Sequence, residues 1–118
     1  MEEKKLIMKK QNKENYLEKK PQRAEINWTE KNGIITLEIE NKGLFNKFAQ
    51  KFFKKPKISY IHLDEMGSFI WPFLDGNKTI IEIGELVQEK FGEKANPLYE
   101  RLAEYMRRLA SYGFIKID

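Results

Sequence analysis

Acidic, hydroxyl and amide side chains gather in the segment LDEMGSFIWPFLDGNKTIIEIGE, residues 63–85. Two carboxylates held close together can act as acid and base, and the segment offers Asp64, Glu65, Asp75, Glu82 and Glu85. Asp64, however, stands where a helix N-cap belongs, and Asp75-Gly76 is typical of a helix end. Thr79 and Glu82 have the spacing of a capping box, in which each side chain bonds the other residue's amide. We therefore interpret these residues as structural and expect no catalytic site.

No other pattern for catalysis or metal binding is found in the sequence. The chain has no cysteine, which excludes disulfides, thiolate metal sites and cysteine nucleophiles. His62 is the single histidine, and it is either a packed or solvent-edge strand residue or a ligand-binding one. Gly-rich phosphate loops and nucleophile elbows are missing as well. The sequence thus predicts a protein that is not an enzyme and uses no metal or cofactor.

Composition predicts a small protein of the cell interior. Its 118 residues, 41% of them hydrophobic, suffice for one small domain with a core. The N-terminus lacks the roughly 7–15 apolar residues of a signal peptide, and no stretch approaches the roughly 20 of a membrane span. We expect a cytoplasmic protein. Its net charge of +4 is uneven, because residues 1–57 hold 15 Lys/Arg and 8 Asp/Glu, whereas residues 58–118 hold 7 and 10.

Three strands are predicted in the first half of the chain. Apolar and polar residues alternate on both sides of Asn32-Gly33 in AEINWTEKNGIITLEIEN, residues 24–41. Because Asn-Gly favours the two positive φ angles of a type I′ turn, this segment is predicted as a β-hairpin. The segment ISYIHL, residues 58–63, is apolar and β-branched and predicts a third strand.

Three helices follow in the prediction. Helical spacing of apolar residues predicts the first over residues 64–74, and the capping box starts a second over residues 79–91. Asn96-Pro97, an N-cap followed by proline at the first helical position, starts a third that reaches about residue 112. The segment FIKI, residues 114–117, can add a short final strand. This order predicts an α+β, winged-helix-like domain, in which a three-helix bundle follows a small antiparallel β-sheet.

Two segments stand apart from these elements. Residues 1–22 predict a charged arm, partly disordered or a short helix, and residues 23–118 predict the domain. Within the domain, residues 43–55 predict an inserted amphipathic helix, whose basic side consists of Lys47, Lys51, Lys54 and Lys55. These lysines either are solvated while the apolar side closes the core, or meet an anionic membrane or an acidic partner. Trp71 lies off the apolar stripe of its helix; it either packs under this insertion or the arm, or marks a contact surface.

The third predicted helix carries two apolar stripes. The first, the expected core face, consists of Leu98, Leu102, Tyr105, Leu109 and Tyr112. The second, about 100° around the helix, consists of Tyr99, Ala103, Met106 and Ala110. A second stripe of small, soft and aromatic side chains suits a shallow groove for a peptide, unless the inserted helix covers it. A DNA-binding winged helix is the alternative, although the acidic balance of residues 58–118 opposes phosphate binding.

The run ISYIHLDEMGSFIWPFLDGNKTIIEIGELVQEKFG, followed by YERLAEYMRRLASYGFI, resembles the PqqD family. Its namesake is the pyrroloquinoline quinone biosynthesis protein D. The matching features are a strand leading into Leu63-Asp64-Glu65, a helix ending at Leu74-Asp75-Gly76, and a second helix opening at Thr79. Phe91-Gly92 then closes the second helix, and the third ends at Tyr112-Gly113. The resemblance covers about residues 58–117, and the hairpin fits the family's first two strands.

This resemblance implies a non-catalytic peptide chaperone, which binds a precursor or leader peptide and presents it to a modifying enzyme of the radical-SAM type. It implies that the peptide adds as a strand to the third strand and lies against the third helix. The positions so implied are Ser59, Tyr60, Ile61 and His62 on the strand, and Tyr99, Leu102, Ala103, Met106 and Ala110 on the helix. The inserted basic segment and the long N-terminal arm depart from the family pattern.

Overall fold

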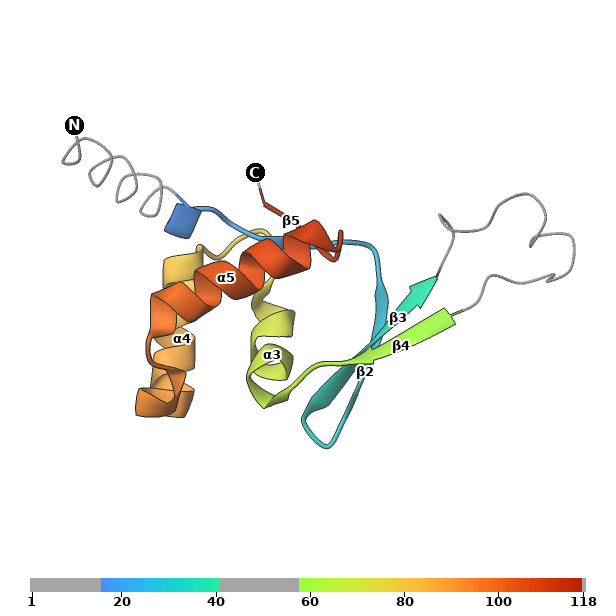
Figure 1. The fold of residues 1–118 in the computed structure, drawn as a ribbon, viewed down its shortest axis with the longest axis horizontal. Coiled ribbons are helices and arrows are strands. Elements are labelled where there is room, and N and C mark those ends of the chain that lie inside the picture. The colour runs from blue at the N-terminus through green and yellow to red at the C-terminus, as the bar shows by residue number, and fades with distance from the viewer. Residues whose placement is uncertain (1–15, 41–57, 118) are drawn as a thin grey trace, which may run out of the picture. The chain divides into compact units, whose positions relative to one another are not determined.

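The computed structural model describes residues 16–40 and 58–117 of the chain (Figure 1). Its strands are β1 (Gln22–Arg23), β2 (Asn27–Lys31), β3 (Ile34–Glu40), β4 (Ile58–His62) and β5 (Ile115–Lys116). Its α-helices are α3 (Glu65–Ile70), α4 (Ile80–Phe91) and α5 (Leu98–Ser111), and two short 3-10 helices are η1 (Trp71–Phe73) and η2 (Gly92–Ala95). Small antiparallel sheets with three helices confirm the predicted α+β class.

The described residues form two compact units. Those between 25 and 68 make one, called the sheet unit, and those before 25 and after 68 make the other, called the helical unit. The predicted arm over residues 1–22 and insertion over residues 43–55 lie largely or wholly outside the described residues, so both stay predictions.

The sheet unit is built on the predicted hairpin. Asn32 and Gly33 have φ angles of 53° and 78°, the two positive values that a type I′ turn requires. This turn sets the register, with Thr29 opposite Thr36, and β4 pairs antiparallel with the other side of β3. Side chains on β3 alternate in burial, and Ile35 and Leu37 are buried. The three predicted strands form, and they follow the order β2-β3-β4.

A buried serine closes the ladder between β3 and β4. The Leu63 N–H donates to the Ile35 carbonyl at 2.8 Å, which leaves the Ile35 N–H and the Leu63 carbonyl to find partners. Ser68 Oγ accepts from the Ile35 N–H at 2.8 Å and donates to the Leu63 carbonyl at 3.3 Å. Asp64 Oδ1 accepts from the Gly67 N–H at 2.7 Å, which is the predicted N-cap bond of α3. The strand is thus joined to the helix by short side chains.

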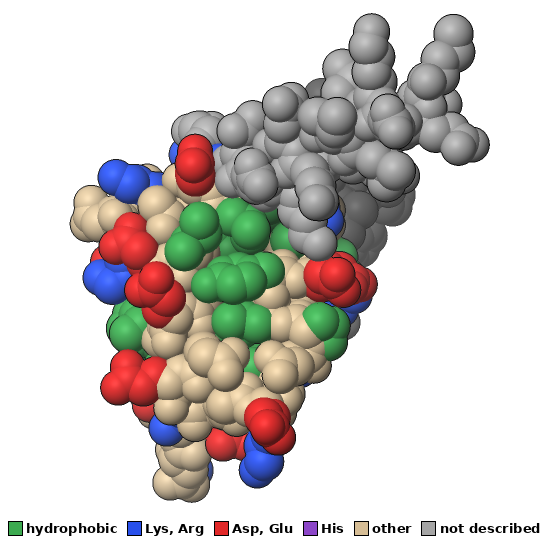
Figure 2. All heavy atoms as spheres, turned by 90° about the vertical axis from the view of Figure 1, so that its left-hand side faces the viewer, with side chains coloured by type: hydrophobic (Ala, Val, Ile, Leu, Met, Phe, Trp, Pro, Cys, Tyr) green, Lys and Arg blue, Asp and Glu red, His purple; other side chains and the backbone are tan. Residues whose placement is uncertain are grey.

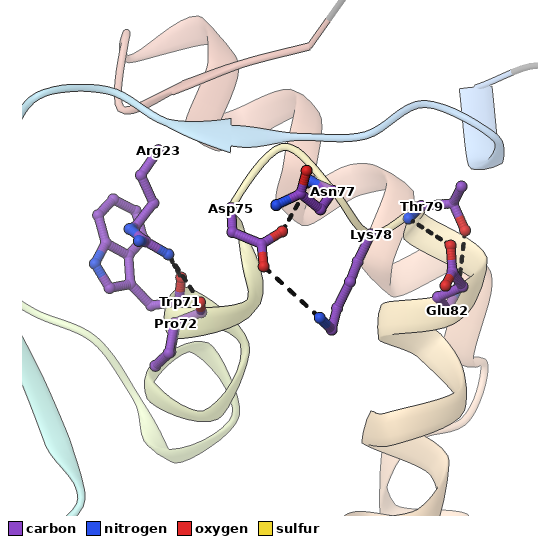
Figure 3. Close-up of polar contacts among 8 residues, drawn as sticks. All are labelled: Arg23, Trp71, Pro72, Asp75, Asn77, Lys78, Thr79 and Glu82. Atoms are coloured by element: carbon purple, nitrogen blue, oxygen red, sulfur yellow. Dashed lines mark hydrogen bonds and ion pairs between the residues drawn. The ribbon is translucent and has the colours of Figure 1, made fainter.

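In the helical unit, Pro72 tightens the chain into η1 directly after α3, because it has no N–H to continue an α-helix. Trp71 is 0% exposed, so it is packed and the exposed contact surface is wrong, whereas packing under the insertion or the arm stays a prediction. Its indole N–H has no hydrogen-bond partner among the described residues. Arg23 donates to the carbonyl oxygens of Trp71 and Pro72 at 3.1 and 2.8 Å (Figure 3). The Trp71 carbonyl also accepts from the Leu74 N–H at 3.2 Å, and the Arg23 side chain is bonded to both residues of the Trp71–Pro72 step.

Two carboxylates stabilise the turn into α4. Asp75 Oδ1 accepts from the Asn77 N–H at 2.9 Å, and this backbone hydrogen bond is the main cause that lowers the pKa of Asp75. Thr79 and Glu82 form the predicted capping box, with both bonds at 3.1 Å (Figure 3). The backbone N–H of Thr79 is likewise the main cause that lowers the pKa of Glu82. Of the acidic residues between 63 and 85, Asp64, Asp75 and Glu82 thus accept hydrogen bonds from the backbone and have structural roles.

The start of α5 differs from the prediction. Asn96 does not cap it: no side-chain cap bond is formed, the cap position is Pro97, and the Asn96–Pro97 peptide bond is cis. Asn96 instead ends η2, since its N–H donates to the Glu93 carbonyl at 3.1 Å. The predicted end is confirmed, because Gly113 follows the helix with a φ of 78°.

The predicted final strand forms, and its partner is a strand that the sequence analysis did not anticipate. In β5, Ile115 and Lys116 pair antiparallel with Arg23 and Gln22 of β1. The Ala24 N–H also donates to the Phe114 carbonyl at 2.9 Å, and the Gly76 N–H donates to the Pro21 carbonyl at 3.0 Å. The two sequence segments of the helical unit are therefore joined by backbone hydrogen bonds.

Candidate functional site

Strand β4 lies at an edge of its sheet. It pairs with β3 on one side, and among the described residues no strand pairs with its other side. Its sequence, Ile58-Ser59-Tyr60-Ile61-His62, contains no Lys, Arg, Asp or Glu. The opposite edge, β2, ends in Glu30-Lys31, and charged side chains of this kind discourage strand pairing. Of the two edges, β4 is the one that its sequence leaves open to another strand.

Alternate residues of β4 turn their backbone groups toward β3. The bond from the Leu63 N–H to the Ile35 carbonyl fixes the phase, and in an antiparallel ladder the pattern repeats every second residue. Ile61 and Ser59, two and four residues back, therefore use their N–H and C=O groups within the sheet. The residues that turn these groups away from β3 are Ile58, Tyr60 and His62.

Those three residues also place their side chains on the exposed face of the sheet. Tyr60 is 61% exposed and Ile58 41% exposed, both high values for large apolar side chains. Thr36 lies opposite His62 on β3, and its Oγ1 is 2.7 Å from His62 Nδ1. Glu38 lies opposite Tyr60. The edge of β4 thus combines outward backbone groups with an exposed aliphatic and an exposed aromatic side chain.

On α5 the buried face lies between the two predicted stripes. The fully buried residues of this helix are Leu102, Ala103, Met106 and Leu109, which come from both stripes. Tyr112, predicted for the core, is 62% exposed, and Leu98 and Tyr105 are only half-buried. The buried face of α5 is therefore rotated by part of a helical turn from the predicted core face, which is wrong in this respect. Of the predicted peptide-binding residues on this helix, only Tyr99 and Ala110 keep exposed surface.

Tyr99 packs closely against α4. A Cβ atom added to Gly84 of α4 would lie 2.6 Å from Tyr99 Cε1 and 3.1 Å from Leu102 Cδ1. Both distances are too short for an unchanged neighbour, so the absence of a side chain at Gly84 allows this approach of the two helices. One flank of the Tyr99 ring is therefore occupied by the protein itself.

Arg107, which belongs to neither predicted stripe of α5, meets the N-terminal segment. The Arg107 guanidinium lies 4.8 Å from the centre of the Tyr16 ring, within the range of a cation–π contact. The Tyr16 hydroxyl is buried without a hydrogen-bond partner among the described residues. Burial raises the pKa of Tyr16, which the nearby Arg107 charge partly offsets. The sequence analysis missed this contact, because residues 1–22 have no sustained apolar period.

The predicted site residues fall in two separate units. Ser59, Tyr60, Ile61 and His62 belong to the sheet unit, whereas the five α5 positions belong to the helical unit. The basic residues Lys47, Lys51, Lys54 and Lys55 lie outside the described residues.

In the described part of the chain, no cluster of three or more His, Asp or Glu side chains could hold a metal ion. No helix in that part is both long and apolar enough to cross a bilayer.

A family model described as Coenzyme PQQ synthesis protein D (PqqD) matches residues 54–115, which hold β4, all three α-helices and the first residue of β5. The chain belongs to the PqqD family. This family consists of peptide-binding accessory proteins of coenzyme PQQ synthesis, which are not themselves catalysts and which work with a precursor peptide and a modifying enzyme. No curated protein and no solved structure matches the chain significantly. Family membership therefore indicates that this PqqD-family chain has a surface that binds a peptide.

Proposed function

We propose that this chain binds the leader segment of a precursor peptide by strand addition along β4 and presents it to a radical-SAM enzyme that modifies it. The single observation that carries the proposal is the uncharged edge strand, whose Ile58, Tyr60 and His62 turn their backbone groups away from β3. A peptide in extended form can satisfy these groups with its own N–H and C=O groups. Family membership supplies the class of ligand and of enzyme.

The contribution of α5 follows from its burial. In the described conformation, Leu102, Ala103 and Met106 are buried, so they support the helix surface and do not touch a ligand. Tyr99 and Ala110 are the two proposed wall residues that retain exposed surface. We expect the strand edge to provide most of the affinity, since backbone bonds form along it whatever the peptide sequence.

The charges of α5 do not favour nucleic acid. Each of its arginines already has a partner within the chain. Arg101 donates to the Lys94 carbonyl at 2.8 Å, Arg108 pairs with Glu104 at 3.0 Å, and Arg107 lies over the Tyr16 ring. Figure 2 shows acidic and basic side chains interspersed around a group of hydrophobic ones. Phosphate binding needs free, clustered cations, so peptide binding accounts better for this surface.

Hydrogen exchange measured by NMR tests strand addition directly. Short peptides selected from a displayed random library on the full chain serve as the probe. On binding, the backbone amides of Ile58, Tyr60 and His62 should exchange more slowly, because each gains a bond to the peptide. The Ile61 amide, already bonded to β3, should change little. A selected peptide that binds without protecting the three outward amides would refute strand addition along β4.

A pair of substitutions at one position isolates the backbone bond. Tyr60→Ala and Tyr60→Pro both remove the ring, but only proline removes the outward N–H, which is tolerated at a sheet edge. The Pro variant should bind the selected peptide about two- to tenfold more weakly than the Ala variant, the effect of one lost hydrogen bond. Equal unfolding free energies would show that both variants keep the fold. Equal affinities would contradict the proposed bond.

A further inference from the structure

Strand addition along an edge gives affinity without sequence preference, so selectivity has to come from side chains beside the incoming strand. On β4 the residues with outward backbone groups also carry the exposed side chains. Tyr60 and Ile58 are the exposed large apolar residues of this strand, two positions apart on one face. A peptide strand paired with β4 would place every second side chain on that same face.

We propose that Ile58 and Tyr60 select, on the exposed face of the sheet, a peptide with β-branched or aromatic residues at alternating positions. This inference rests on the proposed strand addition and names the class of peptide that the edge prefers. Side chains directly opposite each other on paired strands have Cβ atoms about 4.5–5.5 Å apart, so a peptide side chain opposite Tyr60 would lie against its ring. Aromatic pairs with β-branched or aromatic side chains are the favourable cross-strand pairs.

Charge is the competing basis for selectivity on this face. Glu38 lies behind Tyr60 on β3, and it could attract a basic peptide residue. The peptide would be two strands away from Glu38, about 10 Å at the usual strand spacing. This separation exceeds the Debye length of about 8 Å at physiological ionic strength, so an exposed carboxylate there is largely screened. The adjacent Tyr60 ring therefore has the larger effect on which peptide residue is preferred.

His62 limits how far the apolar surface of Ile58 and Tyr60 extends along β4. Its ring is held on the exposed face by Thr36, with Oγ1 and Nδ1 2.7 Å apart. His62 and the Thr36 side chain opposite it thus make the exposed face polar where β4 leads toward α3. The rest of this face of β4 is formed by the apolar side chains Ile58 and Tyr60. The preferred peptide should therefore have its two apolar residues opposite Ile58 and Tyr60, and a polar or small residue opposite His62.

A serine scan of a selected peptide tests this preference. Each residue is replaced in turn, and the affinity is measured by fluorescence anisotropy for the wild-type chain and for Tyr60→Thr, which keeps a strand-forming residue. On the wild type, losses of about two- to fivefold should recur at every second peptide position. On the Tyr60→Thr variant, the loss at the position opposite residue 60 should fall below about twofold, because its aromatic partner is gone.

The outcomes separate this inference from the proposed function. Peptides that protect the Ile58, Tyr60 and His62 amides but show no alternation, or an alternation that Tyr60→Thr leaves unchanged, would overturn the selectivity inference alone. Peptides that leave these amides unprotected would overturn strand addition itself. Replacing Thr29, an exposed residue of the opposite edge strand, by Ser is the matched control and should leave the scan unchanged.

Discussion

At the scale of single residues, the small Ser68 side chain replaces a backbone hydrogen bond of the β-ladder. It is 4% exposed, and its hydroxyl stands between the Ile35 N–H and the Leu63 carbonyl, which would bond each other directly in a regular ladder. The hydroxyl can do this because it donates and accepts at once. The chain can therefore leave β4 and begin α3 without a buried backbone group losing its partner.

Ser68→Ala should destabilise the fold by about 1–3 kcal/mol, because it leaves the buried Ile35 N–H unsatisfied. Urea unfolding followed by circular dichroism measures the change. Ser111→Ala is the matched control: its exposed hydroxyl bonds the Arg108 carbonyl at 2.7 Å in the last turn of α5, and its loss should cost no more than about 0.5 kcal/mol. Equal effects of the two substitutions would show that the buried bridge does not stabilise the strand end.

At the scale of secondary structure elements, Gly84 governs how closely α4 and α5 pack. Glycine in the middle of a helix normally costs about 1 kcal/mol relative to alanine. Here that cost is offset by a close approach of Tyr99 and Leu102, which an alanine Cβ would meet at 2.6 and 3.1 Å. The position of the Tyr99 ring, one of the proposed wall residues, therefore depends on the absence of a side chain on the neighbouring helix.

Gly84→Ala separates these two effects when it is made in two backgrounds. In the wild type, the gain in helix propensity is opposed by overpacking of about 1–3 kcal/mol, so no net stabilisation is expected. In the Tyr99→Ala background the ring is gone, and the same substitution should stabilise the chain by up to about 1 kcal/mol. The free energies of unfolding of the four chains give the coupling. A substitution that has the same effect in both backgrounds would contradict the contact.

At the scale of the whole molecule, carboxylates at helix ends make the free energy of unfolding depend on pH. The pKa values of Asp75 and Glu82 are both lowered, in each case chiefly by a backbone N–H. A carboxyl group whose pKa is lowered by folding stabilises the folded state in full above its unfolded pKa, and this contribution is lost as the pH falls through the folded value. The chain should therefore lose stability as the pH decreases below about 4.5, the region where these groups take up protons.

Glu82→Gln should make the loss of stability below about pH 4.5 less steep, because glutamine can still accept the Thr79 N–H but does not titrate. Urea unfolding at a series of pH values gives the slope. Glu89→Gln removes an exposed carboxylate from the same helix and should follow the wild-type slope. If Glu82→Gln and the wild type have parallel curves, the capping box is not the source of the acid sensitivity.

What the sequence predicted correctly was local. The positive φ angles at Asn32-Gly33 and the capping box at Thr79 and Glu82 depend on residues at most three apart, and both formed as expected. The strand order did not follow from the pattern, because a third strand can pair with either side of a hairpin. Among the proposed binding positions, the exposed Tyr60 and the buried Met106 could not be told apart by pattern, since both were assigned to apolar stretches.

The features that escaped prediction depend on distant residues or on a change of helix type. β1 has only two residues, too short for any period, and its pairing with the predicted final strand spans most of the chain. The helical pattern continued the first helix to residue 74, whereas α3 ends at Ile70 and the tighter 3-10 helix η1 follows from Trp71. The buried face of α5 spans both predicted stripes, and only its neighbours decide which part of an apolar surface is covered.

The pairing of β1 with β5 also bears on the order in which the two units can be completed during synthesis. The three strands of the larger sheet and the Ser68 bridge involve no residue beyond 68, so that ladder can close before the rest of the described chain is made. Gln22 and Arg23 are made before that sheet, whereas their partners Ile115 and Lys116 are made only after all three described α-helices. Until then, the segment that precedes the sheet unit lacks this strand partner.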